Sequence, residues 1–178
     1  MNLNINKYHQ HMISVGIICL LLSFKVYANA AEERYRQAGH PATTADMFYS
    51  LSFDKDASIR KRVASNRKTP KDILLRLASD PDQSVKISIA TNLSASDDVY
   101  LILAKDPMLA VRSVVARFEY VPVVALDILS KDKDVDIRLE VARNLNTTKS
   151  ILLKLTKDPN DSVKRVAEQA LQRLLEDI

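Results

Sequence analysis

The chain has 178 residues, of which 47% are hydrophobic and two are glycine, and its formal net charge is +4. Disordered chains are poorer in apolar residues, so this composition excludes a disordered chain and favours a helix-rich globular protein. The single cysteine, Cys19, excludes a disulfide framework and any cysteine-bound zinc or iron–sulfur site within one chain.

The first thirty residues differ from the rest of the chain. Lys7 precedes an apolar run from Met12 to Phe24, and the triplet Ala28-Asn29-Ala30 follows it. A basic start, a short apolar segment and a small-x-small end are typical of a secretory signal peptide. The run is shorter than the roughly 20 residues that a membrane-spanning helix needs. We therefore predict that residues 1–30 are a cleaved signal peptide and that the mature chain is periplasmic or secreted, with no stable membrane anchor.

Cleavage would change the charge and the supply of reactive side chains. It removes Lys7 and Lys25 and no acidic residue from a formal charge of +4, which leaves +2. It also leaves His40 as the sole histidine and removes the cysteine. A charge this close to balance disfavours a nucleic-acid partner, since such partners select a strong basic excess.

A 26-residue period runs through residues 31–178, which hold about five and a half units. Each full unit starts with an aspartate, a base follows six residues later, and in most units an alanine follows four residues after the base. The aspartates are Asp54, Asp80, Asp106, Asp132 and Asp158, and the alanines are Ala64, Ala90, Ala116 and Ala142. Repetition at a fixed period of this length is the signature of a solenoid.

Each unit is predicted to contain two short helices. The first begins near a serine such as Ser58 and ends near an asparagine such as Asn66, which we expect to adopt the left-handed conformation. The second begins near Thr69, with Pro70 at its first helical position. Helices this short are marginal alone in water, so they must stack on their neighbours. The expected fold is an all-α solenoid, closed after Ser162 by one longer amphipathic helix.

The segment ASNRKTPKDILLRLASDPDQSVKISIATN, residues 64–92, closely resembles the leucine-rich repeat variant (LRV) family. It is similar, more loosely, to short HEAT-like repeats. The resemblance covers nearly the whole mature chain and implies short paired helices wound into a right-handed superhelix. It implies little about function. Some relatives carry a cysteine-rich iron–sulfur segment before the repeats, which this chain lacks.

No catalytic, cofactor-binding or metal-binding constellation is visible in the sequence. His40 occupies the column that asparagine fills elsewhere, so a capping role is favoured over acid–base chemistry. The acidic residues recur once per unit as caps and turn residues, whereas hydrolytic carboxylate pairs gather in one pocket. We therefore expect a non-enzymatic protein without a cofactor.

The most regular polar feature is the basic column, whose members lie six residues after the unit aspartates. It is interpreted mainly as structural, with each base paired to turn aspartates; the alternative is a positive stripe for an anionic partner. Its members are Arg60, Lys86, Arg112, Arg138 and Lys164.

The third full unit departs from the pattern, because apolar residues replace polar ones in its predicted turns. Exposed apolar residues in loops often mark an interaction site, and the alternative is local repacking into the core. If exposed, the substituted residues would form one contiguous partner-binding patch: Met108, Leu109, Phe118, Tyr120 and Val121.

These observations favour an exported helical-repeat scaffold that binds another protein or peptide, an inhibitor or immunity protein being one specialised form. Two alternatives stay open. One is a nucleic-acid-binding HEAT-like solenoid that uses the basic column, and the other is an auxiliary HEAT-like enzyme such as a lyase.

Export makes a direct prediction about the native protein. We expect its amino terminus to be Ala31, because the cut follows the Ala28-Asn29-Ala30 triplet. Intact-mass measurement of protein purified from its native source checks this. An intact Met1 on a protein from the soluble cytoplasm would contradict it.

Overall fold

The computed structural model describes residues 23 and 25–176, and within them every regular element is a helix. The predicted apolar run of the signal peptide, apart from Ser23, lies outside the described residues. Residues 25–39 are helical, and the compact unit that holds the repeats begins at Ala38, seven residues after the predicted mature start. Among the described helices, none combines the length and apolar character required to cross a membrane.

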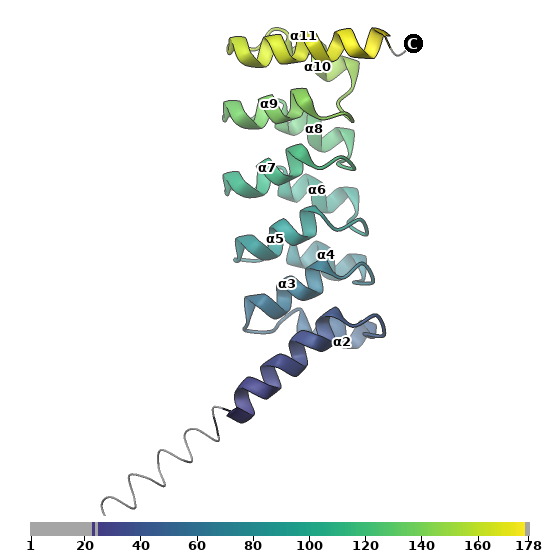
Figure 1. Cartoon of the computed structure of the whole chain (residues 1–178), viewed down its shortest axis with the longest axis vertical. Coiled ribbons are helices and arrows are strands. Elements are labelled where there is room, and N and C mark those ends of the chain that lie inside the picture. The colour runs from purple at the N-terminus through teal and green to yellow at the C-terminus, as the bar shows by residue number, and fades with distance from the viewer. Residues whose placement is uncertain (1–22, 24, 177–178) are drawn as a thin grey trace, which may run out of the picture. The chain divides into compact units, whose positions relative to one another are not determined.

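The repeats form two rows of helices, as Figure 1 shows. The first helices of the units make one row: α3 (Ala57–Ser65), α5 (Gln83–Ala90), α7 (Leu109–Arg117) and α9 (Val135–Arg143). The second helices make the other: α2 (Ala45–Leu51), α4 (Lys71–Leu77), α6 (Asp97–Leu103), α8 (Val123–Leu129) and α10 (Lys149–Leu155). The sixteen-residue α11 (Asp161–Glu176) ends the array as the predicted longer helix.

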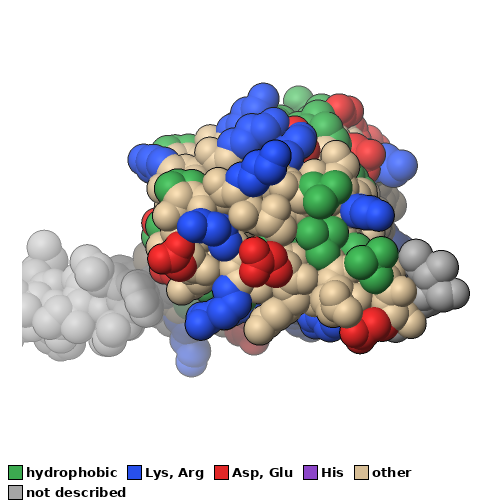
Figure 2. Space-filling view, turned by 90° about the horizontal axis from the view of Figure 1, so that it is seen from above, with side chains coloured by type: hydrophobic (Ala, Val, Ile, Leu, Met, Phe, Trp, Pro, Cys, Tyr) green, Lys and Arg blue, Asp and Glu red, His purple; other side chains and the backbone are tan. Residues whose placement is uncertain are grey.

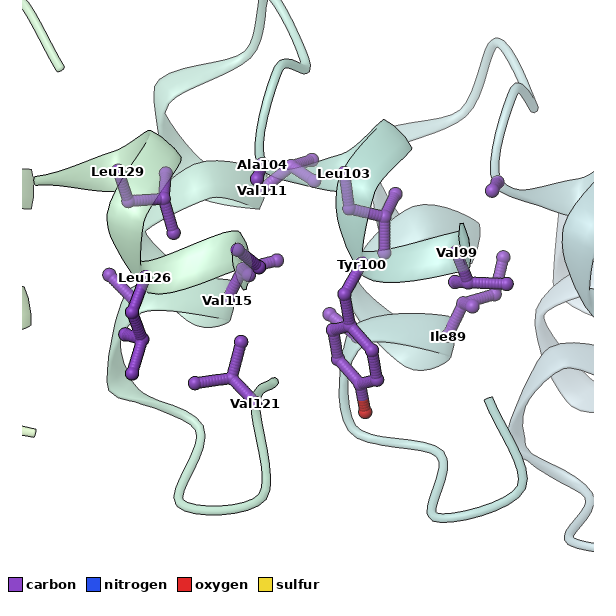
Figure 3. Close-up of a cluster of buried hydrophobic side chains, with 14 of the residues drawn as sticks. Ile89, Val99, Tyr100, Leu103, Ala104, Val111, Val115, Val121, Leu126 and Leu129 are labelled. Carbon is purple, nitrogen blue, oxygen red and sulfur yellow. The ribbon is translucent and has the colours of Figure 1, made fainter. Parts of the chain in front are cut away.

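The core lies between the two rows and continues from unit to unit. Figure 3 shows its centre, where side chains of α5 to α8 meet. The alanine of each first helix is fully buried. Its small side chain lets the neighbouring unit approach closely, whereas a larger one would hold the units apart. The predicted apolar columns are therefore the surfaces on which successive units stack.

Three of the four first helices begin at aspartates rather than at the predicted serines, and α7 begins at Met108. Asp56, Asp82 and Asp134 are the N-cap residues, and each carboxylate accepts a hydrogen bond from the backbone N–H two residues later. The expectation was wrong by two positions because Ser58 and Ser84 supply the N–H that is capped. An aspartate also places negative charge at the positive end of the helix dipole.

The asparagines that follow the first helices are not left-handed. Asn66 and Asn144 have extended backbones, and no described residue has a positive φ. Their side chains explain the difference. Asn66 Oδ1 accepts from the N–H of Lys68, which holds the turn, while Asn66 Nδ2 donates to the carbonyl of Ala38 in the preceding unit. Pro70 likewise lies one position earlier than predicted, as the N-cap residue of α4.

The stacking scheme predicts a large loss of stability for Leu103→Ala, because the side chain is fully buried between units. We expect a loss of about 2–5 kcal/mol from reduced apolar burial and the remaining cavity. Urea denaturation measures it. The exposed leucine of the same helix row, Leu153, provides the control: Leu153→Ala should leave the midpoint nearly unchanged. Equal effects of the two changes would contradict the scheme.

Candidate binding surface

Four buried ion pairs join the first helix of one unit to the aspartate that starts the next unit. In the pair Arg112–Asp132, the guanidinium Nε donates to Oδ2 at 2.6 Å and Nη2 donates to Oδ1 at 3.2 Å. The Nη1 group donates to the carbonyl of Asp106 in its own unit at 2.8 Å. We call this series the ion-pair ladder: Arg60–Asp80, Lys86–Asp106, Arg112–Asp132 and Arg138–Asp158.

The ladder uses the donors of the basic column inside the protein. The side chains of its four pairs are 13% exposed or less. Lys86 is the one lysine among them, and its ammonium donates to Asp106 at 2.6 Å without the fork geometry of arginine. Lys164, on α11, pairs instead with Asp161 on the surface. The four buried bases therefore have little capacity left for the phosphates of a partner.

The five predicted partner-binding residues of the third unit do not form one contiguous patch. Met108 and Leu109 lie at the start of α7, whereas Phe118, Tyr120 and Val121 follow its end. A nine-residue helix is about 13 Å long, so the two groups are separated by that distance. A single patch was expected only if all five residues were exposed, and of the five only Leu109 and Tyr120 are.

Two of these five residues are used in packing. Val121 is 0% exposed and lies beside Leu126 in the core, because it replaces the buried threonine of other units (Figure 3). Phe118 is partly buried, and its ring stacks on Tyr100 with the centroids 6.1 Å apart. Burial raises the pKa of Tyr100 to about 12. The prediction that Val121 contacts a partner is wrong, since a fully buried side chain offers no contact.

The remaining three residues have different exposures. Met108 is partly buried against the core, while Leu109 and Tyr120 are exposed. Tyr120 packs edge-to-face on Phe118, with the ring centroids 5.7 Å apart. The turn between α7 and α8 therefore carries a small aromatic cluster. Its solvent-accessible ring is that of Tyr120.

A more extended apolar surface lies on the second helices, which sequence reasoning did not single out. Each of these helices exposes at least one apolar side chain on its outer side. We call the set the apolar row; its members are between 38% and 59% exposed: Tyr49, Leu75, Ile102, Val124 and Leu153. A signal was present in the sequence, because Tyr49, Leu75, Leu101 and Leu153 share one repeat position.

Contacts between neighbouring second helices make this surface continuous. The guanidinium of Arg76 on α4 lies 3.9 Å from the ring centroid of Phe53, which follows α2. The same side chain donates to the carbonyl of Ser52. Farther along, Lys154 on α10 donates to the carboxylate of Asp127 on α8 at 2.8 Å. Adjacent units thus present one surface rather than separate ridges.

Lysines line the carboxyl-terminal edge of the second helices in the last three units. We call Lys105, Lys131 and Lys157, which share one repeat position and are exposed, the lysine row. Asp127 accepts hydrogen bonds from Lys131 at 2.6 Å and from Lys154, which hold the pKa of its carboxyl below the usual value. Figure 2, a view onto the end of the array that carries α11, shows Lys and Arg side chains gathered at that end.

The described residues contain no group of three or more His, Cys, Asp or Glu side chains placed to hold a metal ion. His40 acts as a turn residue there, since its Nδ1 accepts a hydrogen bond from the N–H of Ala42 at 3.1 Å. The asparagine side chains make the same contact in later units. His40 thus serves the turn in the manner of Asn66.

Comparison with protein-family models and with curated protein sequences found no match. The resemblance to the LRV family therefore stays a hypothesis that rests on the repeat columns.

The ladder predicts a pH-dependent loss of stability for Arg138→Gln. Arg138 and Asp158 are 11% and 4% exposed, and their hydrogen bonds hold the pKa of Asp158 below its usual value. At pH 7 the variant retains a buried carboxylate without its cation, so it should lose about 3 kcal/mol. An aspartate with a depressed pKa stabilises the fold above its unfolded pKa of about 3.9.

Acid should therefore reduce the difference in unfolding free energy between the unmodified chain and the Arg138→Gln variant, because Asp158 of the variant becomes protonated first. Urea denaturation at pH 7 and near pH 3.5 measures both values. The surface change Lys164→Gln is the control from the same column and should leave the midpoint unchanged. A gap of the same size at both pH values would show that Asp158 does not carry the effect.

Proposed function

We propose that the mature chain, residues 31–178, is an exported binding module that engages another protein or peptide and has no catalytic role. The observation that carries this proposal is the apolar row, which extends along five consecutive second helices. Monomeric soluble proteins rarely expose extended apolar surfaces unless these contact a partner. A stacked array also presents such a surface over a greater length than one short helix can.

The alternatives receive less support from the geometry. A nucleic-acid partner held by the basic column would need guanidinium donors that the ion-pair ladder already uses. An enzyme would need a nucleophile or an acid–base pair near a pocket, and the described ionisable side chains that interact do so as structural ion pairs and caps. Membership of the LRV family, with its implied right-handed superhelix, is part of this proposal.

Capture of the native partner tests the function. We expect a tagged full-length chain to retain a specific protein from the native cell envelope. The double variant Leu75→Ser/Leu153→Ser should retain at least about ten-fold less, because truncating buried interface anchors costs roughly 1–2 kcal/mol each. Both leucines are partly exposed in the free protein, so the melting temperature should fall by only a few degrees.

A matched control separates a specific surface from general stickiness. The variant Leu93→Ser/Leu145→Ser removes two exposed leucines from the turns instead of from the second helices. It should capture the partner as the unmodified chain does. Equal losses in the two double variants, or no specific protein retained by the unmodified chain, would contradict the proposal.

A further inference from the structure

The outer face of the last three second helices combines apolar and basic side chains in a regular layout. Ile102, Val124 and Leu153 of the apolar row are exposed on α6, α8 and α10. The lysine row lies at the carboxyl-terminal end of the same helices. Lys105 follows the C-cap of α6, and its backbone N–H donates to the carbonyl of Ile102 at 3.1 Å, so the two residues belong to one turn. We call this area, from α6 to α10, the mixed face.

The basic side chains of the mixed face keep free donor capacity. Lys131 and Lys154 are 63% and 55% exposed, although each donates one hydrogen bond to Asp127. An ammonium has three donors, so both can bind a further acceptor. Lys149 and Lys157 are also exposed, and with Lys154 and Leu153 they border an open depression on α10. The end of the mixed face on α8 and α10 is therefore strongly positive.

The spacing of the lysine row constrains what can bind along it. Its members are one unit apart, and packed neighbouring helices lie about 8–10 Å apart. Seven residues of an α-helix span about 10.5 Å. A helix that lies along the array therefore presents the same side once per unit, with carboxylates seven residues apart opposite successive lysines.

We propose that the mixed face binds an acidic amphipathic helix of a partner protein. Its apolar side chains cover Ile102, Val124 and Leu153, and its carboxylates pair with Lys105, Lys131 and Lys157. This inference rests on the proposed binding function and names the class of partner. Charge complementarity of this kind directs orientation and association rate, while the apolar contacts supply most of the affinity.

Two other anionic partners fit this face less well. Nucleic acid requires a surface of one sign, whereas Asp98 and Asp127 lie on the same helices as the lysines. An anionic membrane favours lysines around a deeply inserting apolar face, whereas Ile102, Val124 and Leu153 are only 38%, 48% and 49% exposed. The experiment therefore also measures the binding of duplex DNA and of anionic vesicles.

The test uses the full chain and a fluorescent synthetic peptide about three heptads long, with a leucine stripe and one glutamate per heptad beside it. Fluorescence anisotropy gives the dissociation constant. We expect saturable binding that Lys105→Glu/Lys131→Glu/Lys157→Glu weakens by at least about ten-fold. A second peptide carries lysine at the glutamate positions. It should bind this triple variant more tightly than it binds the unmodified chain, so the test includes a gain of binding as well as a loss.

The control reverses the same number of charges elsewhere. Lys61→Glu/Arg117→Glu/Arg165→Glu alters exposed side chains of the first-helix row and α11, and it should bind the acidic peptide within about two-fold of the unmodified chain. Equal weakening in both triple variants would overturn the proposal in favour of unspecific attraction. Tighter binding of duplex DNA or of vesicles with anionic lipid, each lost with the lysine row, would overturn it in favour of those partners.

The native capture experiment separates this inference from the proposed function. The unmodified chain could fail to bind the acidic peptide and still retain a native protein that the Leu75→Ser/Leu153→Ser variant loses. In that case the acidic-helix inference is wrong and the binding function stands. If the peptide binds and the lysine row controls both peptide and native capture, the inference is supported.

Discussion

A buried ion pair between consecutive units is the interaction on which the array depends. Each helix is too short to be stable alone, so the fold needs contacts that bring neighbouring units into one register. Arg112 supplies such a contact because one guanidinium binds the carbonyl of its own turn and the aspartate of the next unit. The same aspartate, Asp132, accepts from the N–H of Asp134 and so shapes the turn that starts the next helix. The ladder thus joins turn geometry to unit stacking.

The sequence predicted the features that repeat and missed those that depend on contacts between units. The apolar and alanine columns correctly placed the stacking surfaces, because burial imposes the same period on each unit. Asn66 was expected to be left-handed, but its side chain reaches the carbonyl of the preceding unit from an extended backbone. The residues of one repeat unit do not reveal a contact with a carbonyl of the preceding unit. For Val121 the sequence left partner contact and repacking into the core both open, and the residue fills the buried threonine position.

The irregular third unit illustrates how a repeat tolerates a lost polar contact. Phe118 stands where other units have an asparagine that donates to the preceding unit, and phenylalanine has no donor for that purpose. Stacking on Tyr100, which itself replaces a leucine, provides apolar contact at the same junction. The two substitutions together explain the local departure by packing. The second helices, by contrast, each expose an apolar side chain of the apolar row to solvent.

The most direct test of this account is a double-mutant cycle on Arg112 and Asp132, with Arg112→Met, Asp132→Leu and both changes together. Each single change should be strongly destabilising, because it leaves the other charge buried and unpaired, whereas the double change removes both charges. We expect a coupling free energy of about 1–3 kcal/mol from urea denaturation. Additive single effects, with a coupling within about 0.5 kcal/mol of zero, would show that the pair does not join the units.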